Sequence, residues 1–233
     1  MLDAIPDRLA DVRARIAGAA GRAGRDPATV RLIAVSKTFS ADHVRAAAAA
    51  GQVDFGENKV QEGVSKIDAL TDLPLRWHLI GHVQSNKAKK AGARFNTIQS
   101  VDSADLLQRI DEGAAGAGRT VDLLVQVDLA GEATKFGARE DELHTILDRA
   151  RTASSIRVTG LMIIPPVVDD PENARPYFRA LKAVRDRLLQ AGVAPTMLAD
   201  LSMGMSHDFE VAIEEGATII RVGTAIFGGR IVR

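Results

Sequence analysis

The chain of 233 residues contains no cysteine, which excludes disulfides and thiolate metal sites. Basic and acidic residues number 30 each, so the formal net charge is zero. Nucleic-acid and membrane-surface binders usually carry a basic excess, and this balance argues against both as partners. No apolar run approaches the roughly 20 residues of a membrane-spanning helix, and Met1–Asp7 lacks the basic and apolar regions of a signal peptide. We therefore expect a cytoplasmic protein.

Three familiar site patterns are also missing. There is no Gly-x-Ser-x-Gly segment, so an acyl-transfer triad has no support. A dinucleotide-binding sheet needs a Gly-rich turn after an early strand, whereas Lys37–Ser40 follows the first apolar run here. His78 and His82 flank the third predicted strand, and a spacing of four residues along a strand separates side chains by about 13 Å. That distance is too long for one metal ion, and we expect no metal site.

Short apolar runs alternate with helical patterns along the whole chain. Strands are predicted at 31–36, 52–55, 76–80, 97–101, 121–128, 156–163, 196–201 and 218–222. Helices are predicted between them at 41–50, 58–69, 86–92, 103–115, 139–152, 173–190 and 207–215, and an amphipathic helix at 1–24 precedes them. Eight strands separated by seven helices predict an α/β fold, a single (β/α)8 TIM-type barrel over 30–233 with an extra N-terminal helix. We therefore treat 1–233 as one domain; a doubly wound sheet is the competing architecture.

One lysine stands at the end of the first predicted strand. The apolar run Leu32–Val35 is followed at once by Ser36 and Lys37. Partial burial of a lysine lowers its pKa towards the reactive free amine, and such an amine can form a Schiff base with a carbonyl compound. A lysine that points from the strand end into solvent is the alternative that this segment alone leaves open.

The loops after the last two predicted strands resemble phosphate sites. Barrel active sites lie at the carboxyl ends of the strands, and phosphate is usually bound after strands seven and eight. Leu201–Ser206 and Arg221–Ala225 occupy these places, and both are rich in small and hydroxyl residues whose backbone N–H groups can approach a phosphate. Serine and glycine also form ordinary turns, but their occurrence at both places favours a phosphorylated ligand. Asn58, after the second strand, can bind a ligand or cap a helix.

Six blocks, in order from about residue 30 to the end of the chain, resemble the pyridoxal phosphate homeostasis protein family. They are Ala34–Thr38, Phe55–Glu62, Trp77–Lys87, Gly160–Met162, Leu201–Ser206 and Arg221–Gly228. The resemblance implies a single barrel of the alanine racemase type that binds pyridoxal 5'-phosphate. It also implies a role for each of seven residues: Lys37 carries the Schiff base, Ser202, Gly223 and Thr224 hold the phosphate, Met203 and Asn58 lie near the cofactor, and Arg221 faces the pyridine nitrogen.

An arginine at the pyridine nitrogen bears on function. Arginine stays charged and accepts no proton, so it favours the unprotonated ring nitrogen and a weaker electron sink than a carboxylate partner would give. Racemases with this arginine add a second base, typically a tyrosine from a further domain. The single tyrosine of this chain, Tyr177, lies in a helical pattern.

We therefore expect a monomeric carrier rather than an enzyme, with no catalytic residues. Such a protein buffers the cofactor and hands it to pyridoxal phosphate-dependent apoenzymes. A weak amino-acid racemase is the alternative. A barrel that binds an unrelated phosphorylated metabolite is a third hypothesis.

Overall fold

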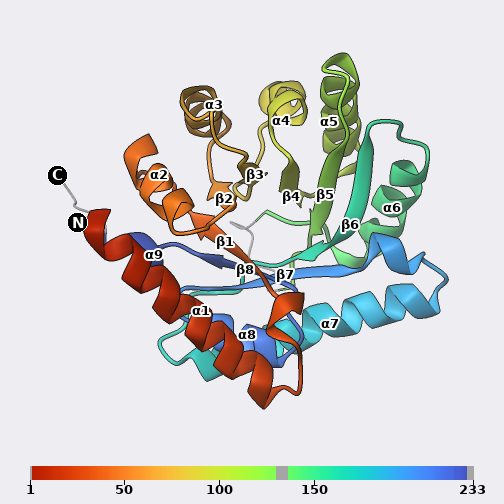
Figure 1. The fold of residues 1–233 in the computed structure, drawn as a ribbon. Helices are drawn as coiled ribbons and strands as arrows, with labels where there is room; N and C mark the ends of the chain where they lie inside the picture. The colour runs from red at the N-terminus through yellow and green to blue at the C-terminus, as the bar shows by residue number, and fades with distance from the viewer. Residues whose placement is uncertain (1, 130–135, 230–233) are drawn as a thin grey trace.

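The computed structural model describes residues 2–129 and 136–229. Within these residues, eight parallel strands pair in sequence order and form a closed barrel (Figure 1). The strands are β1 (Arg31–Val35), β2 (Asp54–Glu57), β3 (Arg76–Leu79), β4 (Thr97–Val101), β5 (Val121–Gln126), β6 (Ile156–Met162), β7 (Asp200–Met205) and β8 (Ile219–Val222). β1 pairs with both β2 and β8, which closes the barrel. The predicted TIM-type fold is confirmed.

Helices surround the strands. The α-helices are α1 (Ile5–Arg22), α2 (Ala41–Ala49), α3 (Val60–Ala69), α4 (Ala88–Arg94), α5 (Ala104–Gly116), α6 (Leu143–Arg151), α7 (Arg175–Gln190), α8 (Phe209–Glu214) and α9 (Thr224–Phe227). Short 3-10 helices are η1 (Leu2–Ala4), η2 (Pro27–Thr29), η3 (Ser85–Lys87), η4 (Glu140–Glu142), η5 (Pro171–Ala174) and η6 (Pro195–Met197). None of the described helices is both long and apolar enough to cross a membrane.

Apolar side chains pack on both sides of the strands. A small cluster joins Ile33, Leu124, Met162 and Ile219, from strands on opposite sides of the barrel, so it lies inside the barrel. A much larger cluster packs between the strands and the helices. Because successive side chains on a strand point to opposite faces, Arg221 shares the inward face of Ile219.

The N-terminal helix completes the outer layer of the barrel. α9, which follows β8, has four residues and is too short to cover it. α1 packs against α8, α9 and α2, and lies along the outside of the barrel beside them (Figure 1). Its buried residues are Ile5, Leu9, Val12, Ile16, Ala19 and Ala20. These positions recur every three or four residues, the spacing of one helix face.

The predicted bounds of the seventh strand were wrong. We predicted 196–201, but β7 runs from Asp200 to Met205, and η6 covers Pro195–Met197. A proline lacks the N–H that a strand ladder uses and its fixed φ suits the first position of a helical turn. In β7 the apolar residues alternate with the small residues Ser202 and Gly204. Serine and glycine are also common in turns, so this part of the sequence resembles a loop. The second strand was likewise placed two residues too early, since β2 spans Asp54–Glu57 rather than 52–55.

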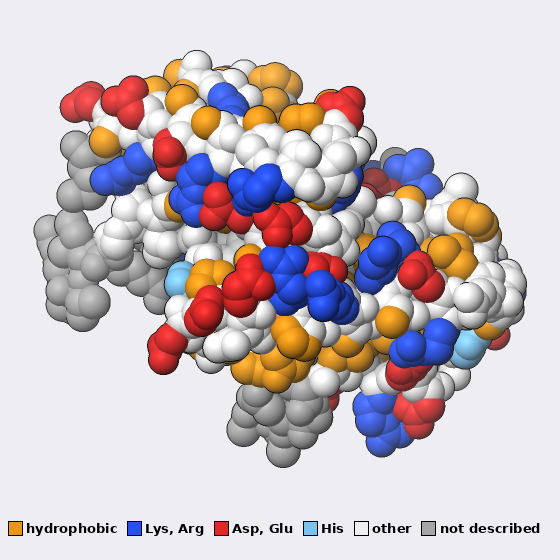
Figure 2. All heavy atoms as spheres, turned by 90° about the horizontal axis from the view of Figure 1, so that it is seen from below, with side chains coloured by type: hydrophobic (Ala, Val, Ile, Leu, Met, Phe, Trp, Pro, Cys, Tyr) orange, Lys and Arg blue, Asp and Glu red, His pale blue; other side chains and the backbone are white. Residues whose placement is uncertain are grey.

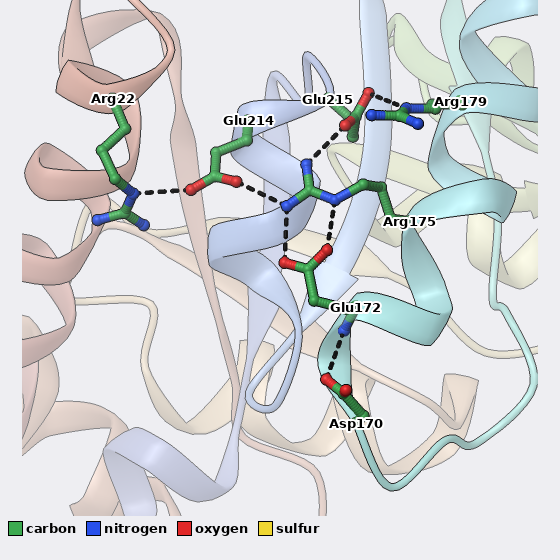
Figure 3. Close-up of polar contacts among 7 residues, drawn as sticks. All are labelled: Arg22, Asp170, Glu172, Arg175, Arg179, Glu214 and Glu215. Atoms are coloured by element: carbon green, nitrogen blue, oxygen red, sulfur yellow. Dashed lines mark hydrogen bonds and ion pairs between the residues drawn. The ribbon is translucent and has the colours of Figure 1, made fainter.

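Arg175 at the start of α7 is the centre of an ion-pair network (Figure 3). Its guanidinium binds both carboxylate oxygens of Glu172 at 2.6 and 2.7 Å. It also donates to Glu214 at 2.8 Å and to Glu215 at 2.6 Å. The Arg175 side chain is 19% exposed, so water screens these contacts less than it screens an ordinary surface pair.

The same network reaches α1. Arg22, the last residue of α1, donates to Glu214 over 2.7 Å, while Arg179 donates to Glu215 over 3.0 Å. The hydrogen bonds from Arg175 and then Arg22 hold the pKa of the Glu214 carboxyl below its usual range. Figure 2 shows basic and acidic side chains interleaved over this underside of the molecule.

We predict that Arg175→Ala lowers the free energy of unfolding by about 1–3 kcal/mol, since it removes the centre of a partly buried network. The pKa of Glu214 is lowered in the folded state, so its contribution to the free energy of unfolding is fully present above the unfolded-state pKa of about 4.3. This contribution is lost as the pH falls through the folded-state pKa. The gap between wild type and variant therefore narrows below about pH 4. Urea unfolding across this pH range measures it.

Arg185→Ala is the matched control. Arg185 lies on the same helix and pairs with its chain neighbour Asp186. An equal loss of stability in both variants would show that the network adds nothing beyond a local ion pair.

Candidate functional site

Five of the predicted site residues converge where β2, β1 and β8 lie side by side. Lys37 follows β1 and Asn58 follows β2. Arg221 lies in β8, and Gly223 and Thr224 come directly after it. Because β1 pairs with both neighbours, the carboxyl ends of these three strands form one edge of the barrel mouth.

Arg221 is a buried cation inside the barrel, with 4% of its surface exposed. Nη1 donates to Ser202 Oγ over 2.6 Å and Nη2 donates to the Ile163 carbonyl over 2.7 Å. Burial lowers its pKa to about 10, and the charge of Asp208 acts in the opposite direction. The guanidinium is therefore still charged at neutral pH, and these bonds use two of its five N–H donors.

Ser202 and Met203 lie inside β7, not in the loop where the sequence analysis put them. Ser202 is fully buried, and its hydroxyl donates to Gln99 Oε1 over 2.7 Å. Met203 is also fully buried and belongs to the large cluster between strands and helices, together with Leu201. The two residues therefore point to opposite sides of the barrel wall.

Ser206 joins the loop after β7 to the loop after β8. Its hydroxyl oxygen accepts from the backbone N–H of Gly223 at 3.0 Å and from that of Ala225 at 3.5 Å. The chain reaches Ser206 through Gly204, whose φ of 94° favours glycine and where a Cβ would lie 2.6 Å from Ala212 Cβ. Ser206 was not among the predicted site residues, because the resemblance implied Ser202 as the phosphate residue of the segment Leu201–Ser206.

The acceptor atom of Asn58 is buried. Asn58 Oδ1 is shielded from solvent and has no hydrogen-bond partner among the described residues. The neighbouring loop approaches closely, since a Cβ on Gly81 would lie 2.3 Å from the Asn58 carbonyl oxygen. A buried polar atom without a partner is uncommon in folded proteins and is consistent with a ligand site.

A buried ionic cluster holds the backbone beside Lys37. Glu57 Oε1 accepts from the hydroxyl of Ser36 at 2.6 Å and from Lys66 Nζ at 2.7 Å. Lys66 Nζ also donates to the Ser36 carbonyl at 2.7 Å and to Glu62 Oε1 at 2.9 Å. Burial raises the pKa of Glu57 even though the Lys66 ammonium opposes the shift.

The other neighbour of Lys37 is held by the same cluster. The backbone N–H of Thr38 donates to Glu62 Oε1 over 2.6 Å, and Thr38 has a φ of 70°, rare for a residue other than glycine. Thr38 and Ser36 are therefore both held by hydrogen bonds, which fixes the backbone position from which the half-buried Lys37 side chain extends. The sequence analysis missed this cluster; the i, i+4 spacing of Glu62 and Lys66 was the available signal.

The two histidines named in the sequence analysis lie in different settings. His78 is buried within β3, and its Nε2 lies 2.9 Å from Asp54 Oδ1. His82 follows the strand and stacks on Phe136 with a ring-centroid distance of 3.6 Å. In the described part of the chain, no three His, Cys, Asp or Glu residues are grouped as metal ligands would be.

We predict that Lys66→Met lowers the free energy of unfolding by about 3–5 kcal/mol at neutral pH, because it leaves the Glu57 carboxylate buried without its cation. Glu57 has a raised pKa in the folded state, so its contribution to the free energy of unfolding is most favourable below the unfolded-state pKa of about 4.3. This contribution is lost as the pH rises through the folded-state pKa. The penalty in Lys66→Met therefore shrinks towards acid pH. Denaturant unfolding at several pH values measures both effects.

The double variant Lys66→Met with Glu57→Leu should recover most of the loss, since it removes the unpaired charge. Lys90→Met is the control for loss of a lysine, because Lys90 on α4 is exposed and its amine donates to Gln61 over 3.3 Å. A double variant no more stable than Lys66→Met would contradict this account.

Known proteins are similar to this chain over nearly its full length. Residues 8–231 match the family described as alanine racemase, N-terminal domain. The pyridoxal phosphate homeostasis protein of Aquifex aeolicus is 43% identical over 225 residues, which are 96% of this chain and 97% of that protein. The protein of the same name from Pseudomonas aeruginosa is 43% identical over 229 residues, 98% of this chain and 97% of that protein.

Solved structures agree with this pattern. PipY of Synechococcus elongatus, solved with PLP bound, is 41% identical, has a TM-score of 0.84 and aligns over 96% of this chain and 100% of its own. Alanine racemase from Corynebacterium glutamicum has a TM-score of 0.74 at 18% identity, over 98% of this chain but 62% of its own. The second likeness is one of fold, and the racemase has further chain outside it.

Proposed function

We propose that this chain, which belongs to the pyridoxal phosphate homeostasis proteins of the alanine racemase N-terminal domain family, binds pyridoxal 5'-phosphate and buffers or carries it. The observation that carries the proposal is the convergence of an anchored lysine, a buried arginine and a hydroxyl-bearing pair of loops at one edge of a parallel barrel. The cofactor has an aldehyde, a pyridine nitrogen and a phosphate, and each finds a partner of suitable chemistry there.

The aldehyde end is assigned to Lys37. Its neighbours Ser36 and Thr38 are held by Glu57 and Glu62. The backbone of Lys37 therefore has a fixed position when its amine bonds a carbonyl carbon. Preorganisation of this kind reduces the entropy lost when the covalent bond forms. Asn58, with its buried and unpartnered acceptor, is suited to a polar group on the ring.

The phosphate end is assigned to Ser206, Gly223 and Thr224. Ser206 and Gly223 are hydrogen-bonded to each other, and Thr224 is exposed beside them. Gly223 lets the loop after β8 pass close to β1, since a Cβ at this position would lie 3.3 Å from the Val35 carbonyl oxygen. The buried Ser202 hydroxyl is engaged with Gln99 and Arg221, so we assign it to the support of Arg221 rather than to phosphate. Met203, on the outer side of the wall, is proposed only as packing behind the site.

Arg221 is assigned to the ring nitrogen, and this argues for a carrier. When bound, pyridoxal phosphate supplies an electron-withdrawing ring whose pull depends on protonation of that nitrogen. Arg221 can only donate and stays charged at neutral pH, so it favours the unprotonated nitrogen and a weak pull. Tyr177, the one tyrosine, is partly buried on α7 and packs against the large cluster outside the barrel, so we assign it a packing role and not that of a second base.

Several finer properties are proposed with the carrier function. We infer a cytoplasmic monomer that delivers the cofactor to pyridoxal phosphate-dependent apoenzymes. The zero net charge and the absence of cysteine are compatible with this setting. The weak racemase remains the second candidate because the racemases share the fold, although this chain spans only 62% of the Corynebacterium glutamicum enzyme.

We predict that Lys37→Ala abolishes covalent attachment of pyridoxal phosphate. Borohydride reduction of the loaded protein, followed by proteolysis and mass spectrometry, should find a pyridoxyl group on Lys37 in wild type and none there in the variant. Lys59→Ala is the control, since Lys59 is exposed next to Asn58 and has no assigned role. A reduced adduct that sits mainly on another lysine would overturn the assignment.

A deuterium-exchange experiment separates the carrier from the racemase. Loaded protein is incubated with L- or D-alanine in deuterated water, and exchange at Cα is followed by NMR. We expect exchange no faster than with free pyridoxal phosphate at the same concentration, because the proposed site assigns Lys37 to one face of the substrate carbon and none of the described residues to the other. Fast exchange or racemisation that Lys37→Ala abolishes would favour the enzyme.

A further inference from the structure

A chain of buried hydrogen bonds runs from Arg221 across the interior of the barrel. Arg221 Nη1 donates to Ser202 Oγ over 2.6 Å, and the Ser202 hydroxyl donates to Gln99 Oε1 over 2.7 Å. Gln99 Nε2 lies 3.4 Å from His78 Nδ1, and His78 Nε2 lies 2.9 Å from Asp54 Oδ1. The five side chains come from five different strands, and each residue is at most 7% exposed.

The hydrogen-bond chain connects the two ends of the barrel. Arg221 lies near the carboxyl end of β8, at the proposed site, whereas Asp54 is the first residue of β2. Asp54 Oδ2 accepts from Arg76, the first residue of β3, over 2.7 Å. The Arg76 side chain is 56% exposed, so the chain ends in solvent on the side opposite the site.

With a neutral His78 ring, one arrangement of protons satisfies every member. Ser202 Oγ accepts from Arg221, so its single proton is available for Gln99 Oε1. The Gln99 amide must then present its NH2 group to His78 Nδ1, which leaves the ring proton on Nε2, facing Asp54. Burial lowers the pKa of His78 and keeps its ring neutral, as this arrangement requires. Every donor therefore points from Arg221 towards Asp54.

Arg221 depends on this chain because its own contacts are neutral. Among the described residues its acceptors are the Ser202 hydroxyl and the Ile163 carbonyl, and no carboxylate pairs with it directly. A buried charge with few and neutral partners is costly, and its position depends on how those partners are held. The Ser202 hydroxyl is held by Gln99, the Gln99 amide by His78, and the tautomer of His78 by Asp54.

We propose that Gln99, His78 and Asp54 are positioning residues that hold Arg221 for the ring nitrogen of pyridoxal phosphate. The proposal rests on the proposed function, since it concerns the site where that ring binds. None of the three is expected to touch the cofactor. Interrupting the chain frees the Ser202 hydroxyl to turn and the guanidinium to shift, which changes the electrostatic environment of the bound ring.

Gln99→Leu is the principal test, because leucine has a similar volume and no polar atom. Loaded wild type and variant are compared by the position of the visible absorption band and by the dissociation constant for pyridoxal phosphate. We expect a shifted band and roughly tenfold weaker binding, which corresponds to about one hydrogen bond. Thr97→Val is the matched control, because Thr97 is also buried in β4 but is outside the hydrogen-bond chain.

The outcomes separate this proposal from the proposed function. Borohydride trapping on Lys37 should persist in Gln99→Leu and in wild type. A wild type that traps no cofactor on Lys37 contradicts the proposed function. If wild type traps the cofactor on Lys37 but Gln99→Leu and Thr97→Val have the same band position and dissociation constant, the role of the hydrogen-bond chain is overturned and the proposed function stands.

A measurement on the wild-type protein covers the case in which Gln99→Leu fails to fold. Long-range proton–nitrogen NMR of uniformly labelled protein at neutral pH reports the tautomer of each of the five histidines, and His78→Asn assigns the signal of interest. We expect His78 as the neutral ring with its proton on Nε2. A proton on Nδ1, or a doubly protonated ring, would contradict the arrangement and the proposal with it.

Discussion

The burial of one guanidinium is the constraint on which the rest of the site depends. Arg221 lies inside a closed barrel that also encloses the apolar cluster of Ile33, Leu124, Met162 and Ile219, and the loss of water around it lowers its pKa to about 10. A charge in that position needs hydrogen-bond acceptors at fixed places. β6 supplies a carbonyl and β7 supplies the Ser202 hydroxyl. From the Ser202 hydroxyl, the hydrogen-bond chain continues through Gln99 and His78 to Asp54 at the far end of the barrel.

The amine at the mouth of the barrel is held by a second, separate arrangement. Lys66 and Glu57 neutralise each other in a buried pair behind β1, and together they bind the hydroxyl and the carbonyl of Ser36. Such a pair adds little net stability compared with apolar residues, but it fixes geometry in a way that apolar packing cannot. β2 and β8, which carry Glu57 and Arg221, both pair with β1, so the proposed site combines a buried cation with a lysine whose two chain neighbours are held.

The outer layer supports these arrangements from a distance. α1 fills the place beside α8 that the four-residue α9 leaves uncovered, and its apolar face seals the barrel wall there. The Arg175 network then joins the end of α1 to α7 and α8 through Glu214 (Figure 3). In the proposed function, Arg221 at the ring nitrogen and a single tyrosine that packs outside the barrel are the two features that favour a carrier over a racemase.

Local sequence determined the order of strands and helices, the amphipathic face of α1 and the place of Lys37 at the end of β1. These features depend on side-chain periodicity and on neighbouring residues, which the sequence displays directly. Only the tertiary structure decided that Ser202 lies within β7 and that Ser206 reaches Gly223. It alone joined Gln99, His78 and Asp54 to Arg221. The ends and register of a barrel strand are set by hydrogen bonds to strands far away in the chain, so no local pattern specifies which polar groups meet inside.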